Sequence, residues 1–311
     1  MFLNEVAEKI LGLKEAQIMN KYAPDVALQN DLMRTLLQDD PQKKELKIYA
    51  DNKESYFNKD VLNVTDNNVV IGQVIVLRNI TPFHELNEAK TNFIATVSHE
   101  LKTPISSIKM SAQLLTDERI GTLSDEQKEL INSIRDDAGR LLKITGELLN
   151  MTQVETGNIQ LKYQQTPPVK IIEQAIRTVK MQAQQKDIEL KVTMDENLPV
   201  IHADAEKTTW VLINFLTNAI KYSSGKAIVE VDVHQKDNQT AFTVTDHGKG
   251  IEKKYLPKIF DRYFKVPGTP ERNGTGLGLS ICKEFIEVQG GSIWVKSTVG
   301  RGSEFGFAFT S

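Results

Sequence analysis

Two long segments in the middle of the chain space their apolar residues by three, four or seven positions, as one face of an α-helix does. The first begins at Thr81, a candidate N-cap, and continues with Pro82, whose missing N–H costs nothing in a first helical turn. It extends to about Thr116. The stripe consists of Leu86, Phe93, Val97, Leu101, Ile108 and Leu115. This pattern predicts a single long helix.

The second periodic segment begins at Ser124, which has the spacing of a capping box with Gln127, and ends near Gly157. The stripe consists of Leu130, Ile131, Ile134, Ala138, Leu141, Thr145 and Leu148. Two long helices joined by a short polar loop predict an antiparallel hairpin. One hairpin cannot bury two wide stripes, so we expect a homodimer in which a second copy completes a four-helix bundle. The alternative is that the stripes pack against the flanking domains.

The segments that flank this hairpin mix helical and strand patterns. The first, residues 1–80, has short helical patterns at 4–13 and 25–38 and strand patterns at 45–49, 56–64 and 69–77. The second, residues 158–311, has strand patterns at 158–163, 188–194, 200–203, 227–234, 240–245, 292–296 and 303–309, and helical patterns at 168–186, 205–222 and 277–289. Asp204 is the expected cap of the helix at 205–222. Helices layered over a mixed sheet predict an α/β sandwich.

The fold class that follows is a multi-domain α+β protein. We expect a small mixed domain at residues 1–80, the helical hairpin at 81–157 and the α/β sandwich at 158–311. A chain of 311 residues is long enough for two or three domains, and 40% hydrophobic residues provide material for real cores. A net charge of −3 gives no bulk electrostatic attraction to nucleic acid or to an anionic membrane.

Other features of the composition bear on cellular location. The single cysteine, Cys282, excludes an intramolecular disulfide and a cysteine metal cluster. No apolar run approaches the length that spans a bilayer, and no signal segment follows Met1. We therefore expect a cytoplasmic location, or the cytoplasmic part of a membrane-anchored sensor if transmembrane segments lie upstream in a longer parent.

His99 is the candidate reactive residue of the first long helix. It lies about 200° around the helix from Val97 and Leu101, so it points away from the stripe. A lone histidine there is usually only a solvated side chain. Here Glu100 follows directly and Thr103 stands one turn on. A neutral imidazole, with a reference pKa of about 6.5, is a competent nucleophile at pH 7, and the neighbouring carboxylate can orient it.

The segment Phe93-Ile94-Ala95-Thr96-Val97-Ser98-His99-Glu100-Leu101-Lys102-Thr103-Pro104 resembles the phosphoacceptor box of bacterial sensor histidine kinases. This resemblance implies that His99 accepts a phosphoryl group. A phosphoacceptor needs a separate domain that holds ATP, and residues 158–311 contain candidates for one.

Three polar residues of the helix at 205–222 share one face. Asn214, Asn218 and Lys221 are spaced i, i+4 and i+7. Amide oxygens suit Mg²⁺, which keeps several waters and is usually shared with phosphate oxygens, and a lysine can meet a phosphate as a point charge. Ordinary polar residues on a solvated face are the alternative, but asparagine is a poor helix former and occurs here twice in an apolar stretch.

Two glycine-rich segments accompany this face. In Asp246-His247-Gly248-Lys249-Gly250-Ile251, Asp246 follows a strand and can accept a hydrogen bond from an exocyclic amine such as that of adenine. Gly274-Thr275-Gly276-Leu277-Gly278-Leu279 opens a helix, where backbone N–H groups form an anion site. Between the two lie Arg262, a candidate ligand of the γ-phosphate, and residues 267–273, which we expect to act as a mobile lid.

Taken together, residues 81–311 resemble the histidine kinases, whose ATP-binding domain belongs to a superfamily shared with DNA gyrase; Gly300-Arg301-Gly302-Ser303-Glu304-Phe305 resembles its last glycine box. The resemblance implies ATP and Mg²⁺ as cofactors, Asn218 as the Mg²⁺ ligand and Asp246 as the adenine anchor. It places Lys221 and Arg262 on the phosphates and Tyr222 near the nucleotide. Asn214 stands where gyrase-like ATPases have a glutamate that activates water, which favours transfer to a side chain over hydrolysis.

The resemblance also selects a set of site residues. The expected catalytic residues are His99, Glu100, Thr103, Asn214 and Arg262. The expected nucleotide-binding residues are Asn218, Lys221, Tyr222, Asp246, Gly248, Gly250, Ile251, Arg262, Gly274, Thr275, Gly276, Leu277, Gly278 and Leu279.

Residues 1–80 resemble the later part of a PAS sensor domain, from an Asn-x-x-Ala-x-x-Ile-Leu-Gly segment at Asn4 to a final hairpin that ends in Arg-Asn-Ile-Thr. The two strands that normally precede the Asn4 position are absent from this sequence. We therefore expect a partial domain that serves as a spacer rather than as a tight ligand site.

Three functions compete at this stage. The leading hypothesis is an ATP-dependent protein-histidine kinase that phosphorylates His99 and passes the phosphoryl group to an aspartate of a response regulator. The second is a phosphatase of that regulator, in which Thr103 positions water, and both activities can coexist in one chain. A non-catalytic dimeric scaffold is the third, and the intact His99, Asn218 and Asp246 argue against it.

Overall fold

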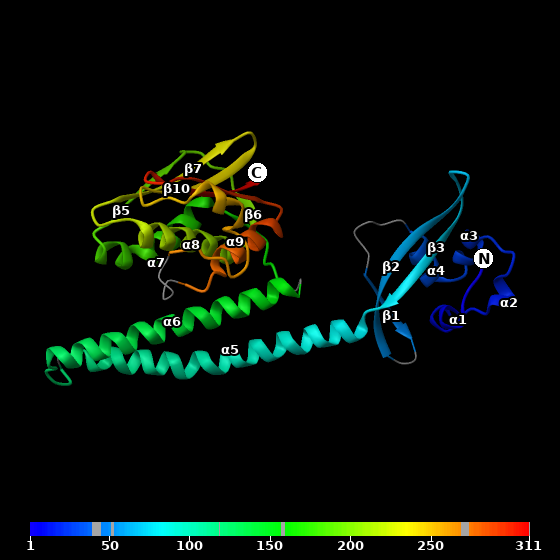
Figure 1. Ribbon diagram of the computed structural model, residues 1–311, viewed down its shortest axis with the longest axis horizontal. Coiled ribbons are helices and arrows are strands. Elements are labelled where there is room, and N and C mark those ends of the chain that lie inside the picture. The colour runs from blue at the N-terminus through cyan, green and yellow to red at the C-terminus, as the bar shows by residue number, and fades with distance from the viewer. Residues whose placement is uncertain (39–44, 51–52, 118, 157–158, 269–273, 311) are drawn as a thin grey trace. The chain divides into compact units, whose positions relative to one another are not determined.

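The computed structural model describes residues 1–38, 45–50, 53–117, 119–156, 159–268 and 274–310. The chain divides into two compact units, Met1–Phe93 and Ile94–Ser311. Helix α5 (Thr81–Leu115) begins in the first unit and ends in the second (Figure 1).

The first unit combines short helices with a three-stranded antiparallel sheet of order β1-β2-β3. Its remaining elements are α1 (Glu5–Leu11), α2 (Glu15–Ile18), α3 (Ala23–Ala27), α4 (Asp31–Leu37), β1 (Glu45–Ala50), β2 (Lys53–Asp66) and β3 (Val69–Asn79). The predicted helix at 25–38 is two helices, because Asn30 accepts a hydrogen bond from the Met33 N–H and donates one to the Leu11 carbonyl. The first bond caps the N-terminus of α4 as a separate helix, and the second links this N-terminus to the end of α1.

Thr81 does not cap α5 as predicted. It is the first residue of the helix, and its own N–H donates to Asn79 Oδ1. The Thr81 hydroxyl instead accepts a 2.8 Å hydrogen bond from the backbone N–H of Tyr56 in β2. The Thr81 hydroxyl, which local sequence predicts to cap the helix, is thus hydrogen-bonded to strand β2 instead.

The hairpin of α5 and α6 (Asp125–Glu155) forms as predicted, and α6 begins with the complete Ser124–Gln127 capping box (Figure 1). The buried positions of α5 in the second unit are Ser98, Ile105 and Ala112. Most of the predicted stripe stays exposed in the single chain. The exposed stripe residues are Leu86, Phe93, Leu101, Ile108, Leu115, Leu130, Ile134, Leu141 and Leu148.

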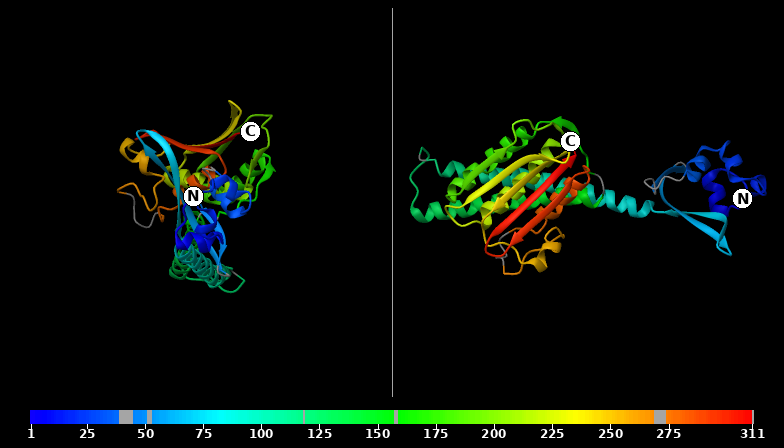
Figure 2. Two further views of the ribbon diagram at one scale, coloured as in Figure 1. Left: turned by 90° about the vertical axis from the view of Figure 1, so that its right-hand side faces the viewer. Right: turned by 90° about the horizontal axis from the view of Figure 1, so that it is seen from above.

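The rest of the second unit is an α/β sandwich built on a five-stranded sheet of order β5-β7-β8-β10-β9. Its elements are β4 (Gln164–Thr166), α7 (Pro168–Gln185), β5 (Glu189–Met194), β6 (Ile201–Ala203), α8 (Ala205–Tyr222), β7 (Ile228–Lys236), β8 (Gln239–Asp246), a 3₁₀ helix η1 (Lys253–Lys258), α9 (Gly278–Glu287), β9 (Ser292–Thr298) and β10 (Gly302–Thr310). Figure 2 (right) shows the five strands from above, with the helices behind them. The pairing of β5 with β7 is parallel, and the other pairings in the sheet are antiparallel.

The core of the sandwich lies between α8 and the sheet. Phe215 of α8 contacts Phe305 of β10 at a ring-centroid distance of 5.4 Å, and Phe242 of β8 stacks on Phe307 at 4.8 Å. Asp204 caps α8 as predicted by accepting from the Lys207 N–H. One face of α8 is thereby fixed in the core, which leaves its polar face for the site.

The predicted strand at 158–163 is wrong over the described residues 159–163, which form no strand, and the strand β4 begins at Gln164. The Lys162 N–H donates to the side chain of Asp204, 42 residues further along the chain. The Asp204 carboxylate thus accepts the hydrogen bond that the Lys162 N–H would otherwise donate to a neighbouring strand. The domain boundary at 157–158 lies outside the described residues.

None of the helices among the described residues combines the length and apolar character needed to cross a bilayer.

Candidate functional site

A pocket in the second unit brings most of the predicted nucleotide residues together. They come from α8, from the end of β8 and the loop after it, and from the glycine-rich segment before α9. The predicted residues that line it are Asn214, Asn218, Lys221, Tyr222, Asp246, Gly250, Ile251, Gly274, Thr275, Gly276, Gly278 and Leu279. Gly248, Leu277 and Arg262 are not among the lining residues.

The polar face of α8 forms one wall of this pocket. Asn214 is buried, and its amide Nδ2 donates a 3.0 Å hydrogen bond to the Trp210 carbonyl one turn earlier. Its Oδ1 faces the start of α9, where a side chain on Gly278 would bring a Cβ within 2.9 Å of it. Asn218 and Lys221 continue along the wall in the next two turns. The i, i+4, i+7 spacing therefore places all three side chains in one pocket.

Positive charge gathers at this wall. The pKa of Lys221 is lowered to about 8, first by burial and then by the positive charge of Lys143 and of other lysines nearby. Lys143, Lys249 and Lys265 line the same pocket. Several ammonium groups held close together favour an anionic ligand, because an anion relieves their mutual repulsion.

Asp246 provides the opposite charge at the end of β8. Burial raises the pKa of this carboxyl group, and the backbone N–H groups of Gly248 and Ser303 partly offset the rise by hydrogen bonding. The bond from Gly248 to Asp246 Oδ1 is 2.8 Å long. Ser303 stands opposite Asp246 in the register of β10 and β8. The acceptor is thus held in place from two sides by backbone donors.

In each segment at least one glycine is required by the protein's own packing. A Cβ on Gly248 would lie 2.4 Å from the Tyr222 carbonyl oxygen. Gly276 has φ +80°, and a Cβ there would lie 2.7 Å from the Tyr263 backbone. At both positions a side chain would therefore collide with the chain itself, whether or not a ligand is bound.

Arg262 lies apart from the residues that line the pocket. Its guanidinium group forms ion pairs of 3.6 Å with Glu155 at the end of α6 and of 3.7 Å with Glu284 in α9. Leu277 also turns away from the lining and joins the hydrophobic core. Of the expected lid, residues 269–273 lie outside the described part of the chain.

The candidate phosphoacceptor is on the solvent-facing side of α5. The side chain of His99 is 82% exposed, and its Nδ1 lies 4.0 Å from Glu100 Oε1. Thr103, one turn further along, is also exposed. The Glu100 carboxylate therefore lies beside the imidazole ring but does not hydrogen-bond to it in this conformation. The α5 helix continues through Pro104, beyond this group.

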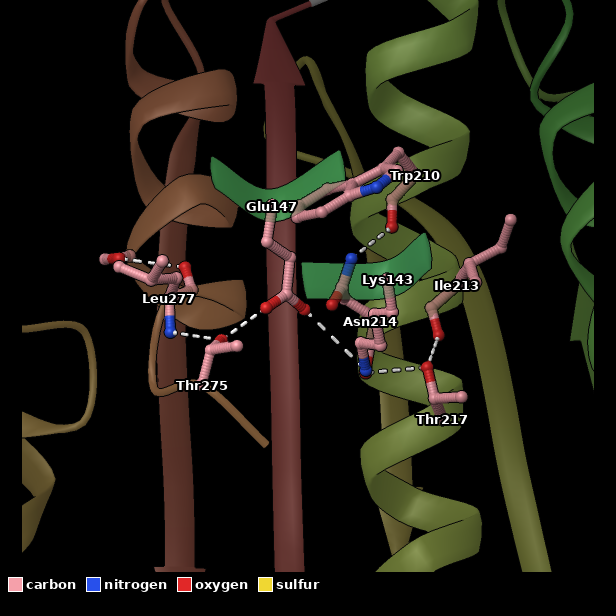
Figure 3. A network of polar contacts seen from close by, with 9 residues as sticks. Lys143, Glu147, Trp210, Ile213, Asn214, Thr217, Thr275 and Leu277 are labelled. Atoms are coloured by element: carbon pink, nitrogen blue, oxygen red, sulfur yellow. Dashed lines mark hydrogen bonds and ion pairs between the residues drawn. The ribbon is translucent and has the colours of Figure 1, made fainter. Parts of the chain in front are cut away.

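Sequence reasoning missed two pocket residues that come from α6, Lys143 and Glu147. Glu147 is only 4% exposed and accepts a hydrogen bond from the Thr275 hydroxyl (Figure 3). The pair has i, i+4 spacing, which usually marks an exposed ion pair on a helix surface. The sequence carries no signal that Glu147 of this pair is buried while Lys143 stays exposed.

Comparisons with known proteins match both halves of this site. Residues 203–310 match the family of histidine kinase-, DNA gyrase B- and HSP90-like ATPases, and residues 89–157 match the His Kinase A (phospho-acceptor) domain. The chain belongs to the histidine kinase family. The two matched domains are in the order that the sequence predicted, and His99 lies in the phospho-acceptor match.

Individual histidine kinases show how far the similarity extends. The sensor protein SrrB of Staphylococcus aureus is 30% identical over a match that covers 97% of this chain and 54% of SrrB. Hybrid signal transduction histidine kinase B of Dictyostelium discoideum is 36% identical over 71% of this chain and 11% of its own length. The chain thus spans about half of SrrB and a small part of the Dictyostelium protein.

Among solved structures, full-length ShkA in complex with AMPPNP is similar to this chain with a TM-score of 0.57. It is 27% identical, and the match covers 70% of this chain and 45% of ShkA.

Proposed function

We propose that this chain is an ATP-dependent protein-histidine kinase, which transfers the γ-phosphoryl group of ATP to His99 and then to an aspartate of a response regulator. The observation that carries the proposal is the combination of an exposed imidazole on α5 with a lysine-rich pocket that contains a buried carboxylate acceptor. On α8, the residue nearest the start of α9 is Asn214, which cannot serve as a general base for water. This favours transfer to a side chain over hydrolysis.

The pocket residues divide the binding of the nucleotide between them. Asp246 accepts a hydrogen bond from the exocyclic amine of adenine, and Lys221 meets the phosphates as a point charge. The N–H groups of Gly274–Gly278 at the start of α9 donate to the phosphate oxygens. Arg262 can join them only after it leaves Glu155 and Glu284.

The donor set fits Mg²⁺ carried by the nucleotide. Among the described residues, no group of three or more histidine, cysteine, aspartate or glutamate side chains could hold a metal ion by itself. Asn218 lines the pocket with an amide oxygen, a ligand that Mg²⁺ accepts beside phosphate oxygens and water. When bound, the ion would neutralise charge on the phosphates, and Asn218 would orient it.

At His99, the imidazole Nε2 attacks the γ-phosphorus of ATP while the bond from this phosphorus to the β,γ-bridging oxygen breaks, so that ADP leaves with that oxygen. Glu100 faces Nδ1, where its carboxylate can orient the ring and hold the remaining proton. Transfer requires the phosphorus about 3–3.5 Å from the nitrogen. We infer that movement of the ATP-binding domain (158–311) relative to the hairpin (81–157) brings them together.

A homodimer forms the working unit in this proposal. The exposed stripes of α5 and α6 give each hairpin a wide apolar face, and a second copy covers it in a four-helix bundle. Residues 1–80 remain a PAS-like spacer in this proposal, and the receiver domain of a response regulator is the partner that takes the phosphoryl group from His99.

The test compares wild type with His99→Gln after incubation with Mg²⁺ and ATP labelled on the γ-phosphate. We expect label on the wild type that survives alkali and is lost in acid, as a phosphoramidate is, and no label on the variant. Nucleotide binding by His99→Gln is the control for folding. Acid-stable label, or label that persists in the variant, would place the acceptor on another residue such as Ser98 or Thr103.

A second activity, removal of the phosphoryl group from the regulator, is favoured by the position of Thr103. Its side chain is exposed one helical turn from His99, on the same side of α5. Once the regulator docks at His99, this hydroxyl can position the water that attacks the aspartyl phosphate.

A further inference from the structure

The second half of α6 packs on the ATP-binding domain. Met151 and Val154 belong to the same buried core as residues of α8 and α9. At about 100° per residue, Val154 lies roughly 140–160° around α6 from the exposed stripe residues Ile134 and Leu141, and Met151 lies roughly 80–100° from them. The docking face and the proposed dimer face of α6 are therefore separate, and both can be covered at once.

Glu147 extends from this docking face into the nucleotide pocket. One carboxylate oxygen accepts from the Thr275 hydroxyl, and the other lies 3.7 Å from Lys143 Nζ (Figure 3). A Cβ on Gly278, the first residue of α9, would lie 3.8 Å from the second oxygen. The carboxylate thus stands at the glycine-rich segment and at the start of α9, where the proposed function places the phosphates.

The surroundings of Glu147 are those of a bound anion. An α-helix N-terminus favours negative charge, and a hydroxyl donor and an ammonium group complete the setting. With 4% of its surface exposed, the carboxylate has exchanged nearly all of its water for these contacts. Nucleotide phosphates added at the same place would bring like charges within a few ångströms in a poorly hydrated site.

We propose that Glu147 is a built-in competitor of the nucleotide: in the docked arrangement its carboxylate occupies the phosphate subsite, so that docking of α6 and binding of ATP oppose each other. The inference rests on the proposed function, since it takes the pocket to be the ATP site. The ligand class that displaces Glu147 is a nucleoside di- or triphosphate, and a nucleoside without phosphates leaves it in place.

A second contact couples docking to Arg262. Glu155, two turns beyond Glu147 on α6, forms one of the two ion pairs of Arg262, which is not among the residues that line the pocket; Glu284 of α9 forms the other. Docking therefore fills the phosphate subsite and also keeps a candidate phosphate ligand away. Release of α6 by ATP frees Arg262 from Glu155 and lets the ATP-binding domain move toward His99.

The test measures binding of AMPPNP and of adenosine to the full chain, each with Mg²⁺, by calorimetry. Glu147→Gln keeps the shape of the side chain and removes its charge. We expect AMPPNP to bind more tightly by about five- to 150-fold, the usual range for coupling between sites, and adenosine affinity to stay unchanged. Glu129→Gln, an exposed position on the same helix, is the matched control and should alter neither affinity.

Three results would overturn the inference. AMPPNP affinity that is unchanged or weaker in Glu147→Gln, with wild type binding normally, would remove the competition and leave the proposed function intact. Equal tightening for adenosine would place the effect outside the phosphate subsite. Absence of AMPPNP binding by wild type and Glu147→Gln alike, with both folded by circular dichroism, would remove the proposed function and the inference with it.

Discussion

The backbone N–H of Gly248 donates a 2.8 Å hydrogen bond to Asp246 Oδ1, across the sharp turn that ends β8. A Cβ on Gly248 would lie 2.9 Å from this same oxygen, so the turn closes around the carboxylate only with glycine at this position. The carboxylate is therefore held before any ligand arrives. Pre-positioning of this kind lowers the ordering that binding must impose.

Asp246→Asn should weaken ATP binding while the fold is retained. Loss of one hydrogen bond to a charged group costs about 1.5–3 kcal/mol, which corresponds to a loss of affinity of about 10- to 150-fold. Calorimetry measures the affinity. Asp237→Asn is the matched control, because Asp237 is exposed in the β7–β8 turn at φ 50°, a conformation that asparagine tolerates. Equal affinities of wild type and Asp246→Asn would remove Asp246 from the adenine site.

Lys221 should make ADP binding depend on pH. Its folded pKa of about 8 lies below the ordinary value of 10.5, so the ammonium group loses its proton as the pH rises through about 8. ADP affinity should then fall between pH 7.5 and 9.5. Lys221→Arg keeps its charge over this range and should bind ADP with little pH dependence. The same pH slope in both proteins would show that another group is responsible.

The same shift has a consequence for the nucleotide-free chain. A lysine whose folded pKa is lowered disfavours folding while it is charged, so its unfavourable contribution is fully present below about pH 8. Between about pH 8 and 10.5 the unfolded chain binds more protons at this position than the folded chain. The free energy of unfolding should therefore rise with pH in wild type relative to Lys221→Arg, as measured by urea unfolding.

Ile134→Glu should dissociate the proposed dimer. Ile134 is exposed in the single chain, in the middle of the α6 stripe, and a charge there would be buried unpaired in the bundle. Sedimentation velocity should give a dimer for wild type and a monomer for the variant. Asn132→Glu adds the same charge on the opposite side of α6, where the residue is exposed, and should remain dimeric. A dimer of unchanged stability in Ile134→Glu would mean that the stripe is not the interface.

Thr103→Ala should leave phosphorylation of His99 nearly unchanged and slow the loss of phosphate from the partner regulator. Its hydroxyl is exposed one turn from His99, and removal takes away a group that can hold water without affecting the imidazole. Phosphate release from the labelled receiver domain measures the effect, and Thr103→Ser, which keeps the hydroxyl, is the control. If Thr103→Ala released phosphate as fast as wild type, Thr103 would have no part in the dephosphorylation.

Local sequence was sufficient wherever a short-range interaction decides the structure. The Ser124–Gln127 capping box and the Asp204 cap start α6 and α8 where predicted, because each cap needs only groups three residues apart. The spacing of Asn214, Asn218 and Lys221 likewise places them on one face of a helix, whatever the helix packs against. Helical geometry thus predicted the wall that α8 gives to the pocket, whereas the resemblance to histidine kinases supplied the pocket residues outside α8.

Tertiary structure decided what depends on partners far along the chain. The backbone at Lys162 is held by Asp204 rather than by a strand, and Arg262 is held by Glu155 and Glu284 apart from the residues that line the pocket. Glu147 and Lys143 look like any exposed pair on a helix until docking buries the carboxylate beside Thr275. The physical reason is the same in each case: a charged or polar group takes whichever partner the fold brings near, and its neighbours in sequence do not specify that partner.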